Sequence, residues 1–232
     1  MYNIYRNICV LCTVVIGGNM TKLILIRHGE SLGNAVRKLL GHTDLDLSPL
    51  GYQQAEAAAV ALKDERIDAI YSSDLLRAYN TAVPHARLRG IDVIPSKQLR
   101  EVMLGEWEGQ FAVDIIEKYG DMYEKDWLSG FGTFRFPGGE STLEAGKRFY
   151  QECARIADEN DGKTILITAH AAVIRAFFSL VLEIAPEDVA STIPFPSNAS
   201  YSEVFYENGG FKSGRFSVDD HLAEIGITKY NG

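Results

Sequence analysis

The chain has 232 residues, which corresponds to one large domain or at most two small ones. Hydrophobic residues make up 46% and charged residues 23%, close to the average of globular proteins, so collagen-like, low-complexity and wholly disordered chains are excluded. The formal net charge of −8 argues against nucleic-acid binding, and any anionic ligand must be held by a local cluster of basic side chains.

Residues 1–19 differ in composition from the rest of the chain. They contain one charged side chain, Arg6, and an apolar run from Ile8 to Ile16 that is too short to span a bilayer. We predict that this leader is not part of the domain and that the native start is Met20, because a glycine pair shortly before a methionine is what a ribosome-binding sequence gives when it is translated. A signal peptide is the alternative.

The three cysteines are too few and too scattered for a disulfide framework, which favours a reducing, cytoplasmic compartment. Cys9 and Cys12 form a Cys-x-x-Cys pair inside the leader, whereas Cys153 stands alone. With no second pair or histidine nearby, the pair is not expected to bind metal.

From residue 22 onward, short apolar runs alternate with helix-capping signals. Ser48-Pro49, Asp74 and a capping box over residues 141–144 predict helix starts. The expected elements are strand 22–26, helix 48–63, strand 67–71, helix 74–89, strand 91–94, helix 141–160, strand 164–168, helix 171–183, and antiparallel edge strands 201–206 and 214–218. This alternation predicts an α/β three-layer sandwich with a mostly parallel central sheet and helices on both faces.

We predict a single domain over residues 20–232, with a small cap inserted at about 111–140. This segment is aromatic and glycine-rich and has weak periodicity. The aromatic residues in and near it either border the ligand pocket, which would favour an apolar or ring-bearing ligand, or pack together as a small core. They are Trp107, Phe111, Tyr119, Tyr123, Trp127 and Phe131.

Charged side chains follow four of the predicted strands. Arg27 and His28 follow the first, Arg77 the second, Glu101 the third and His170 the fourth. Each alone has an ordinary structural explanation, such as a surface ion pair. Because ligands of parallel sheets bind beyond the carboxyl ends of the strands, their joint occurrence predicts one anion-binding pocket.

The motifs around these residues carry a resemblance to a known family. Residues 27–31 read Arg-His-Gly-Glu-Ser, and Asn34 follows three positions later. Further matches follow in order within 41–55, 72–82, 99–109, 137–141 and 168–170. Together they resemble the histidine phosphatase superfamily, also called phosphoglycerate mutase-like, over most of the chain from Met20.

The resemblance implies a metal-independent phosphomonoesterase that needs no cofactor and forms a phosphohistidine. It makes His28 the nucleophile and Glu101 the general acid and base. Of the remaining implied residues, Arg27 and Arg77 are both catalytic and substrate-binding, and His170 is a catalytic residue that adds a further donor. Asn34 and Ala171 are substrate-binding residues, and Ala171 stands where the family usually has glycine. Ser31 is expected to start a helix, and Gly29 to allow a close backbone approach or a positive φ. The other histidines, His42, His85 and His221, are predicted to be surface or structural residues.

The subclass is inferred from the interval between Glu101 and His170. This interval is too short for the insertion with an arginine pair and a lysine that a mutase would use to bind the substrate carboxylate, and Lys147 and Arg148 are expected on the solvated face of a helix. We therefore predict a phosphatase of a small phosphorylated metabolite. Phosphoglycerate mutase or sugar bisphosphatase is one alternative, and a weakly catalytic phosphate-binding interaction protein is another.

The expected partner is a small-molecule phosphate ester, without nucleic acid or membrane, and a homodimer is left open. Sugar phosphates, phosphoglycerates, α-ribazole phosphate and phosphorylated amino acids all remain candidate substrates.

Overall fold

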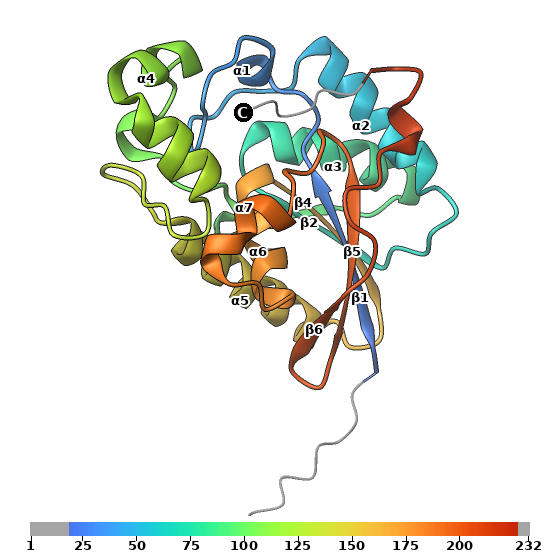
Figure 1. The fold of residues 1–232 in the computed structure, drawn as a ribbon. Helices are drawn as coiled ribbons and strands as arrows, with labels where there is room; N and C mark the ends of the chain where they lie inside the picture. The colour runs from blue at the N-terminus through green and yellow to red at the C-terminus, as the bar shows by residue number, and fades with distance from the viewer. Residues whose placement is uncertain (1–18, 227–232) are drawn as a thin grey trace, which may run out of the picture.

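The computed structural model describes residues 19–226, so Cys9, Cys12 and nearly all of the predicted leader lie outside the described residues. A six-stranded sheet lies at its centre, in the order β3-β2-β4-β1-β5-β6 (Figure 1). The first four strands in sequence are mutually parallel, β5 runs antiparallel to β1, and β6 runs antiparallel to β5, which confirms the predicted mostly parallel α/β sandwich. The strands are β1 (Thr21–Arg27), β2 (Ala69–Ser73), β3 (Val93–Ser96), β4 (Thr164–Ala169), β5 (Tyr201–Glu207) and β6 (Gly210–Ser213).

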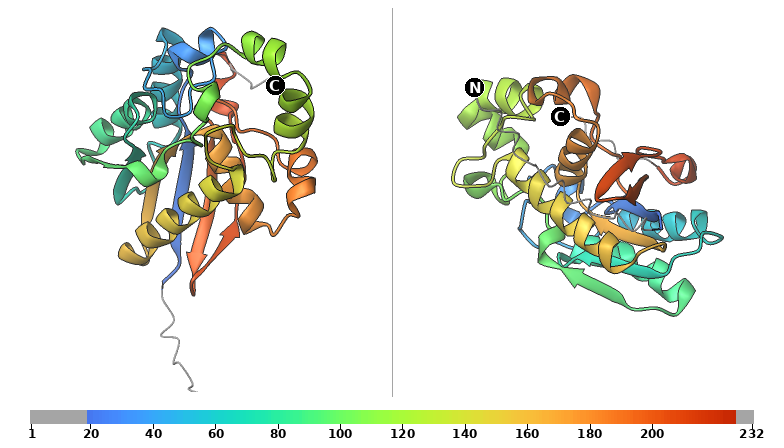
Figure 2. Two further views of the ribbon diagram at one scale, coloured as in Figure 1. Left: turned by 90° about the vertical axis from the view of Figure 1, so that its left-hand side faces the viewer. Right: turned by 90° about the horizontal axis from the view of Figure 1, so that it is seen from below.

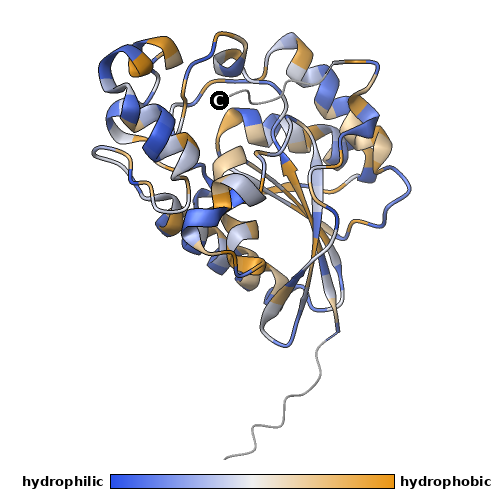
Figure 3. Ribbon diagram, in the orientation of Figure 1, coloured by the Kyte–Doolittle hydropathy of each residue, from blue (hydrophilic) through white to orange (hydrophobic). Residues whose placement is uncertain are grey.

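Helices cover both faces of the sheet (Figure 2). Successive side chains of a strand point to opposite faces, so Ile24 and Ile26 of β1 join one buried cluster and Leu23 and Leu25 another. The first cluster packs under α2 (Pro49–Ala61) and α3 (Leu76–Arg89), and the second under α5 (Thr142–Glu159) and α6 (Ala171–Val181). Figure 3 shows the resulting apolar strands at the centre of the molecule.

Three of the predicted helix starts are confirmed by their hydrogen bonds. The Ser48 hydroxyl accepts from the Gly51 N–H at the start of α2, and Ser141 and Glu144 form the reciprocal capping box of α5. Ser31 caps the short helix α1 (Leu32–Ala35), as expected.

The prediction that Asp74 caps the next helix is wrong. The N-cap of α3 is Leu75, whose aliphatic side chain cannot accept a hydrogen bond. The Asp74 carboxylate instead forms a two-pronged ion pair with Arg100, with both contacts at 2.6 Å. A fixed guanidinium fork outcompetes a single backbone N–H for this carboxylate.

The last predicted strand, 214–218, is also wrong. Asn208 and Gly209 both adopt positive φ and form a two-residue turn, so the chain pairs back at once as β6. Residues 214–218 still run along β5, because Glu203 exchanges backbone hydrogen bonds with Gly214 and Arg215 and Val218 bridges to Tyr201, but they form no regular strand. Strand β3 begins two residues later than predicted, and α3 continues through Pro84.

The segment predicted to be a cap contains α4 (Ala112–Tyr119) and a π-helix (Met122–Ser129), drawn in green in Figure 1. Its aromatic rings pack on one another: Trp127 lies 4.8 Å from Phe136 and Trp107 lies 5.4 Å from Tyr119, centroid to centroid. They are continuous with the core under α5 and α6 and do not form a separate one.

Short elements complete the chain. They are α7 (Val189–Thr192) and the 3-10 turns Lys97–Leu99, Gly105–Trp107, Pro186–Asp188 and Asp220–Leu222. Within residues 19–226, no helix is both long and apolar enough to cross a bilayer.

Candidate active site

The parallel register brings the predicted residues to one edge of the sheet. Arg27, the last residue of β1, lies beside Ala169, the last residue of β4, so that His28 and His170 follow side by side. Their rings lie 5.2 Å apart, centroid to centroid, in an edge-to-face arrangement. Arg77 projects from the first turn of α3, directly after β2. The strand ends therefore place these four residues together, as the sequence predicts.

His28 is held in one tautomer. Its Nδ1 lies 2.6 Å from the carbonyl oxygen of Gly29, and because a carbonyl only accepts, Nδ1 carries the proton and Nε2 keeps its lone pair. Burial, reinforced by the charges of Arg77 and Arg27, lowers the pKa of His28 well below its usual range. A neutral imidazole with a free Nε2 is the form required of a nucleophile.

Gly29 holds this turn by close contact and does not need a positive φ. A Cβ at this position would lie 2.5 Å from the carbonyl oxygen of Gly51, which no side chain could tolerate without a backbone shift. Its N–H donates to the Thr81 hydroxyl at 3.0 Å, so the residue after the histidine is fixed to both α2 and α3.

Two buried arginines border the His28 side chain. Arg27 donates to the carbonyl of Pro196 at 2.6 Å. The two terminal nitrogens of Arg77 donate to backbone carbonyls: Nη1 to that of Thr43, at 2.8 Å, and Nη2 to that of Gly41, at 2.7 Å. The Nε of Arg77 is buried and has no hydrogen-bond partner within the described part of the chain. Burial lowers the pKa of Arg77 to about 10, so it remains charged at neutral pH.

His170 is fully buried next to His28. Its Nε2 lies 2.8 Å from the Ser73 hydroxyl, whereas Nδ1 finds no partner among residues 19–226. Burial and the nearby Arg77 charge lower the pKa of His170 well below its usual range. Ala171 begins α6 with ordinary helical geometry, so its methyl group, in place of the usual glycine hydrogen, causes no strain in the turn.

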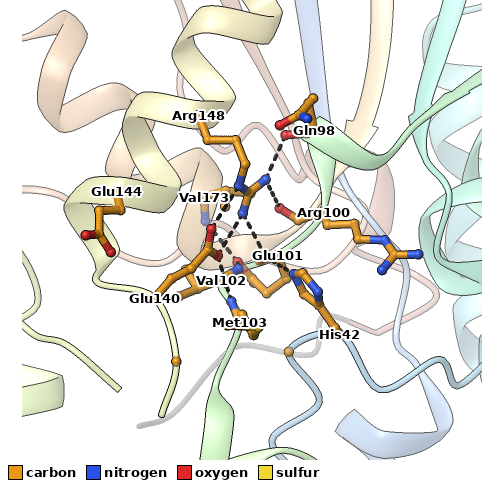
Figure 4. Close-up of polar contacts among 12 residues, drawn as sticks. His42, Gln98, Arg100, Glu101, Val102, Met103, Glu140, Glu144, Arg148 and Val173 are labelled. Carbon is orange, nitrogen blue, oxygen red and sulfur yellow. Dashed lines mark hydrogen bonds and ion pairs between the residues drawn. The ribbon is translucent and has the colours of Figure 1, made fainter. Parts of the chain in front are cut away.

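Glu101 is fixed by the N-terminus of α6. Its carboxylate accepts from the backbone N–H groups of Ala172 and Val173, each at 3.1 Å, and from Val102 at 2.9 Å (Figure 4). The N-terminus of a helix stabilises negative charge. Glu101 itself lies in an irregular segment between β3 and Trp107, and not at the end of a strand.

The prediction that Arg148 points to solvent is wrong. Its side chain is only 19% exposed and reaches from α5 toward the Glu101 segment (Figure 4). His42, predicted to be structural or on the surface, also contacts this segment: its Nε2 lies 2.9 Å from the carbonyl oxygen of Glu101. Arg135, by contrast, forms an exposed ion pair with Glu144.

A small pocket of about 80 Å³ lies over these residues. Asn34 borders it, and the Oδ1 of Asn34 accepts from both the N–H and the hydroxyl of Ser31. The predicted residues that line the pocket are Arg27, His28, Asn34, Arg77, Glu101 and Ala171. Of the six aromatic residues considered for the entrance, only Trp127 lines it, so their main role is packing.

Further residues line the pocket that were not predicted from the sequence. Among residues 19–226, Lys38 is the one further charged residue that lines it, and its ammonium nitrogen lies 4.6 Å from the ring centroid of Phe111. Its place between Asn34 and Gly41, two motif positions, is the signal that could have identified it. The other pocket residues not identified from the sequence are Leu39, Leu40, Gly41, Leu104, Ala172 and Phe195.

The described residues contain no group of three or more histidine, cysteine, aspartate or glutamate side chains placed to hold a metal ion. The buried cations and histidines are instead arranged to bind an anion with several oxygens.

The comparisons agree with this geometry. A family model described as the histidine phosphatase superfamily (branch 1) matches residues 23–219. Phosphoserine phosphatase 1 of Hydrogenobacter thermophilus is 32% identical over 207 residues, covering 89% of this chain and 96% of that protein. A 2,3-bisphosphoglycerate-dependent phosphoglycerate mutase of Gloeothece citriformis is 32% identical over 73% of this chain and 88% of its own length. A phosphoserine phosphatase of Entamoeba histolytica, solved with phosphoserine, superposes with a TM-score of 0.76 at 32% identity, covering 87% of this chain and 99% of that one.

Proposed function

Because the chain belongs to the histidine phosphatase superfamily and is a phosphomonoester hydrolase, we propose that its substrate is a small phosphate ester that also carries a carboxylate, with phosphoserine as the first candidate. Two similar proteins are named phosphoserine phosphatases, and one of them was solved with phosphoserine bound. The pocket of about 80 Å³ favours a compact substrate.

The proposed reaction has two steps. In the first, Nε2 of His28 attacks phosphorus; the P–N bond forms and the P–O bond to the leaving group breaks. Glu101 enters this step as the carboxylic acid, gives its proton to the leaving oxygen and becomes a carboxylate. In the second, Glu101 takes a proton from water, the water oxygen attacks phosphorus, and the P–N bond breaks to release inorganic phosphate. Neutral His28, whose Nδ1–H donates to the Gly29 carbonyl oxygen, supports the first step.

The phosphate oxygens are proposed to be bound by a ring of donors. The Nε of Arg77 and the Nδ1 of His170 support this role, because both are buried polar atoms without another hydrogen-bond partner in the described chain. Charge-assisted donors aimed at the transferring group are the main source of catalysis in phosphoryl transfer. The proposed donors are Arg27, Arg77 and Asn34, which line the pocket, and His170, which is buried beside His28 and does not line it.

Lys38 is the reason for proposing that the substrate has a carboxylate. Within residues 19–226 no carboxylate lies within ion-pair distance of its ammonium group, which rests over the Phe111 ring and borders the same pocket as His28. A cation held in place beside the phosphate site, without a protein counter-ion, is suited to a second anionic group on the substrate.

Phosphate release from matched substrate pairs tests this proposal. O-phosphoserine has a carboxylate that O-phosphoethanolamine lacks. In the second pair, 3-phosphoglycerate has a carboxylate where glycerol 3-phosphate has an alcohol. We expect kcat/KM to be about 10- to 100-fold higher for the carboxylated member, because a charge-assisted contact is worth about 1.5–3 kcal/mol. Lys38→Met should abolish that preference, whereas Lys63→Met, an exposed control after α2, should keep it. Equal rates for both members in the unchanged protein would refute the carboxylate.

The alternatives are separated by phosphorus NMR. One of the similar proteins is named a phosphoglycerate mutase. A mutase would convert 3-phosphoglycerate to 2-phosphoglycerate without phosphate release when a trace of 2,3-bisphosphoglycerate is present. A sugar bisphosphatase would release phosphate from a sugar bisphosphate. A weakly catalytic interaction protein would show no turnover and would keep its function in His28→Ala. A phosphatase instead loses turnover in this variant, together with the acid-labile, base-stable phosphoryl adduct.

Several broader expectations stand beside this proposal: the domain limits of 20–232 with a cap at about 111–140, a cytoplasmic location, the absence of nucleic-acid and membrane partners, and a homodimer as the open alternative to a monomer. Limited proteolysis, cell fractionation and light scattering test them in turn.

A further inference from the structure

The segment that carries Glu101 lacks regular secondary structure. Residues 101–104 lie between two 3-10 turns and belong to neither a helix nor a strand. Buried backbone groups still need hydrogen-bond partners, so side chains from elsewhere must supply them. The shape of this segment, and hence the position of the Glu101 carboxylate, therefore depends on those side chains.

Arg148, on α5, supplies three contacts to the backbone leading into this segment, the last of them to Glu101 itself. Its Nη1 donates to the carbonyl oxygens of Gln98, at 2.7 Å, and Arg100, at 3.0 Å, and its Nη2 donates to that of Glu101, at 3.1 Å (Figure 4). A planar guanidinium can bind three carbonyls at once, whereas an ammonium cannot do so with the same geometry.

Glu140 completes the arrangement from the end of the 111–140 segment. Its carboxylate accepts from the Nε and Nη2 of Arg148, at 3.1 and 3.0 Å, and from the N–H of Met103, at 2.9 Å. The backbone N–H of Glu140 also donates to the carbonyl of Met103 at 2.9 Å. One ion pair, 19% and 22% exposed, therefore holds both sides of the Glu101 segment.

We propose that Arg148 and Glu140 are positioning residues for Glu101. They fix the backbone on both sides of it, so that the carboxylate reaches both the start of α6 and the leaving oxygen of the substrate. This inference depends on the acid role of Glu101 in the proposed function. It also links the 111–140 segment to the proton donor, since a displacement of Glu140 would move Glu101.

The leaving group distinguishes positioning from simple structural support. An alkyl phosphate such as phosphoserine needs a proton on its leaving oxygen, whereas p-nitrophenolate leaves without one. The measured quantity is the rate of leaving-group release in the first turnover, which excludes the later hydrolysis of the phosphoenzyme. Glu101→Gln should slow the alkyl ester by about 10²–10⁴ and the aryl ester far less.

Arg148→Met should reproduce this pattern, with a loss of about 10- to 100-fold on the alkyl ester and less than about 3-fold on the aryl ester. Arg148→Lys should recover part of that loss. Arg155→Met is the matched control on the same helix, because Arg155 pairs with Glu152 and Glu159 and contacts no residue of the 98–103 segment. It should leave both rates unchanged.

The outcomes separate the inference from the function that it rests on. Equal losses on both esters in Arg148→Met, or no loss on either, with Glu101→Gln discriminating as expected, overturn the positioning role alone. If Glu101→Gln itself fails to discriminate, the acid role and the inference both fall. Should Arg148→Met not fold, as judged by thermal melting, Glu140→Gln is measured in its place, and the same two patterns decide.

Discussion

His85 offers a quantitative test of how this fold treats a buried histidine outside the site. The side chain lies on α3 with no solvent exposure, and neither ring nitrogen has a hydrogen-bond partner among residues 19–226. Burial, with smaller effects from Arg89 and His221, lowers the pKa of His85 from 6.5 to about 3. The ring is therefore neutral in the folded protein at any mildly acidic pH.

The sign and size of the effect follow from proton linkage. The folded pKa lies below the unfolded one, so the unfolded chain binds more protons, and stability is full above pH 6.5 and falls as pH drops toward 3. Each unit by which the pH falls within this window lowers the free energy of unfolding by about 1.4 kcal/mol. At pH 5.0 the neutral His85 thus lowers the free energy of unfolding by about 2 kcal/mol relative to neutral pH.

His85→Leu removes the titrating group without removing a hydrogen bond. Urea unfolding, followed by tryptophan fluorescence at about pH 7.5 and 5.0, should show a smaller acid loss in the variant, by about 2 kcal/mol. The buried His28 and His170 titrate in both proteins and cancel in this difference. Val83→Ala, on the same helix, should keep the full acid loss. Parallel pH dependences for the His85 variant and the unchanged protein would refute the argument.

Three further outcomes follow from the site. Arg77→Lys should lower kcat/KM by about 10²–10³ in steady-state assays, because an ammonium cannot bind the phosphate and the carbonyls of Gly41 and Thr43 together; a loss under 3-fold would contradict it. Gly29→Ala should lower the free energy of unfolding by about 1–3 kcal/mol in urea titrations, because its Cβ would meet the Gly51 carbonyl; an unchanged midpoint would exclude that contact. Turnover should persist after dialysis against EDTA, and restoration of a lost activity by added metal would oppose the proposed mechanism.

The parts of the site predicted from the sequence are those whose positions follow from the sheet. A buried apolar run ending in Arg27-His28 and another ending before His170 had to meet at one edge, because parallel strands share their carboxyl ends. The local capping signals at Ser48 and Ser141 were equally reliable, since their hydrogen bonds span only three residues.

The parts that were missed depend on contacts between distant segments. From the sequence, Arg148 looks like a solvent-exposed helical residue, because its contact with the backbone carbonyls of residues 98–101 is visible only in the structure. In the same way, the sequence indicates that Asp74 is an N-cap, because its ion pair with Arg100 depends on the fold. The turn at Asn208-Gly209 was different: its hairpin signal was present in the sequence, and the prediction placed the strand beyond it.

This division bears on how the pocket can change its substrate. Arg77 holds the loop that follows Lys38 through the backbone carbonyls of Gly41 and Thr43, so the Lys38 side chain can change without breaking these bonds, whereas Leu39 and Leu40 are buried. Those side chains line the pocket, whereas His28 and Arg27 are fixed by β1 and its neighbours. In the proposed mechanism, substrate preference and phosphoryl chemistry are therefore carried by separate parts of the chain. Substitutions at Lys38 should alter kcat/KM between substrates while leaving the phosphohistidine step intact.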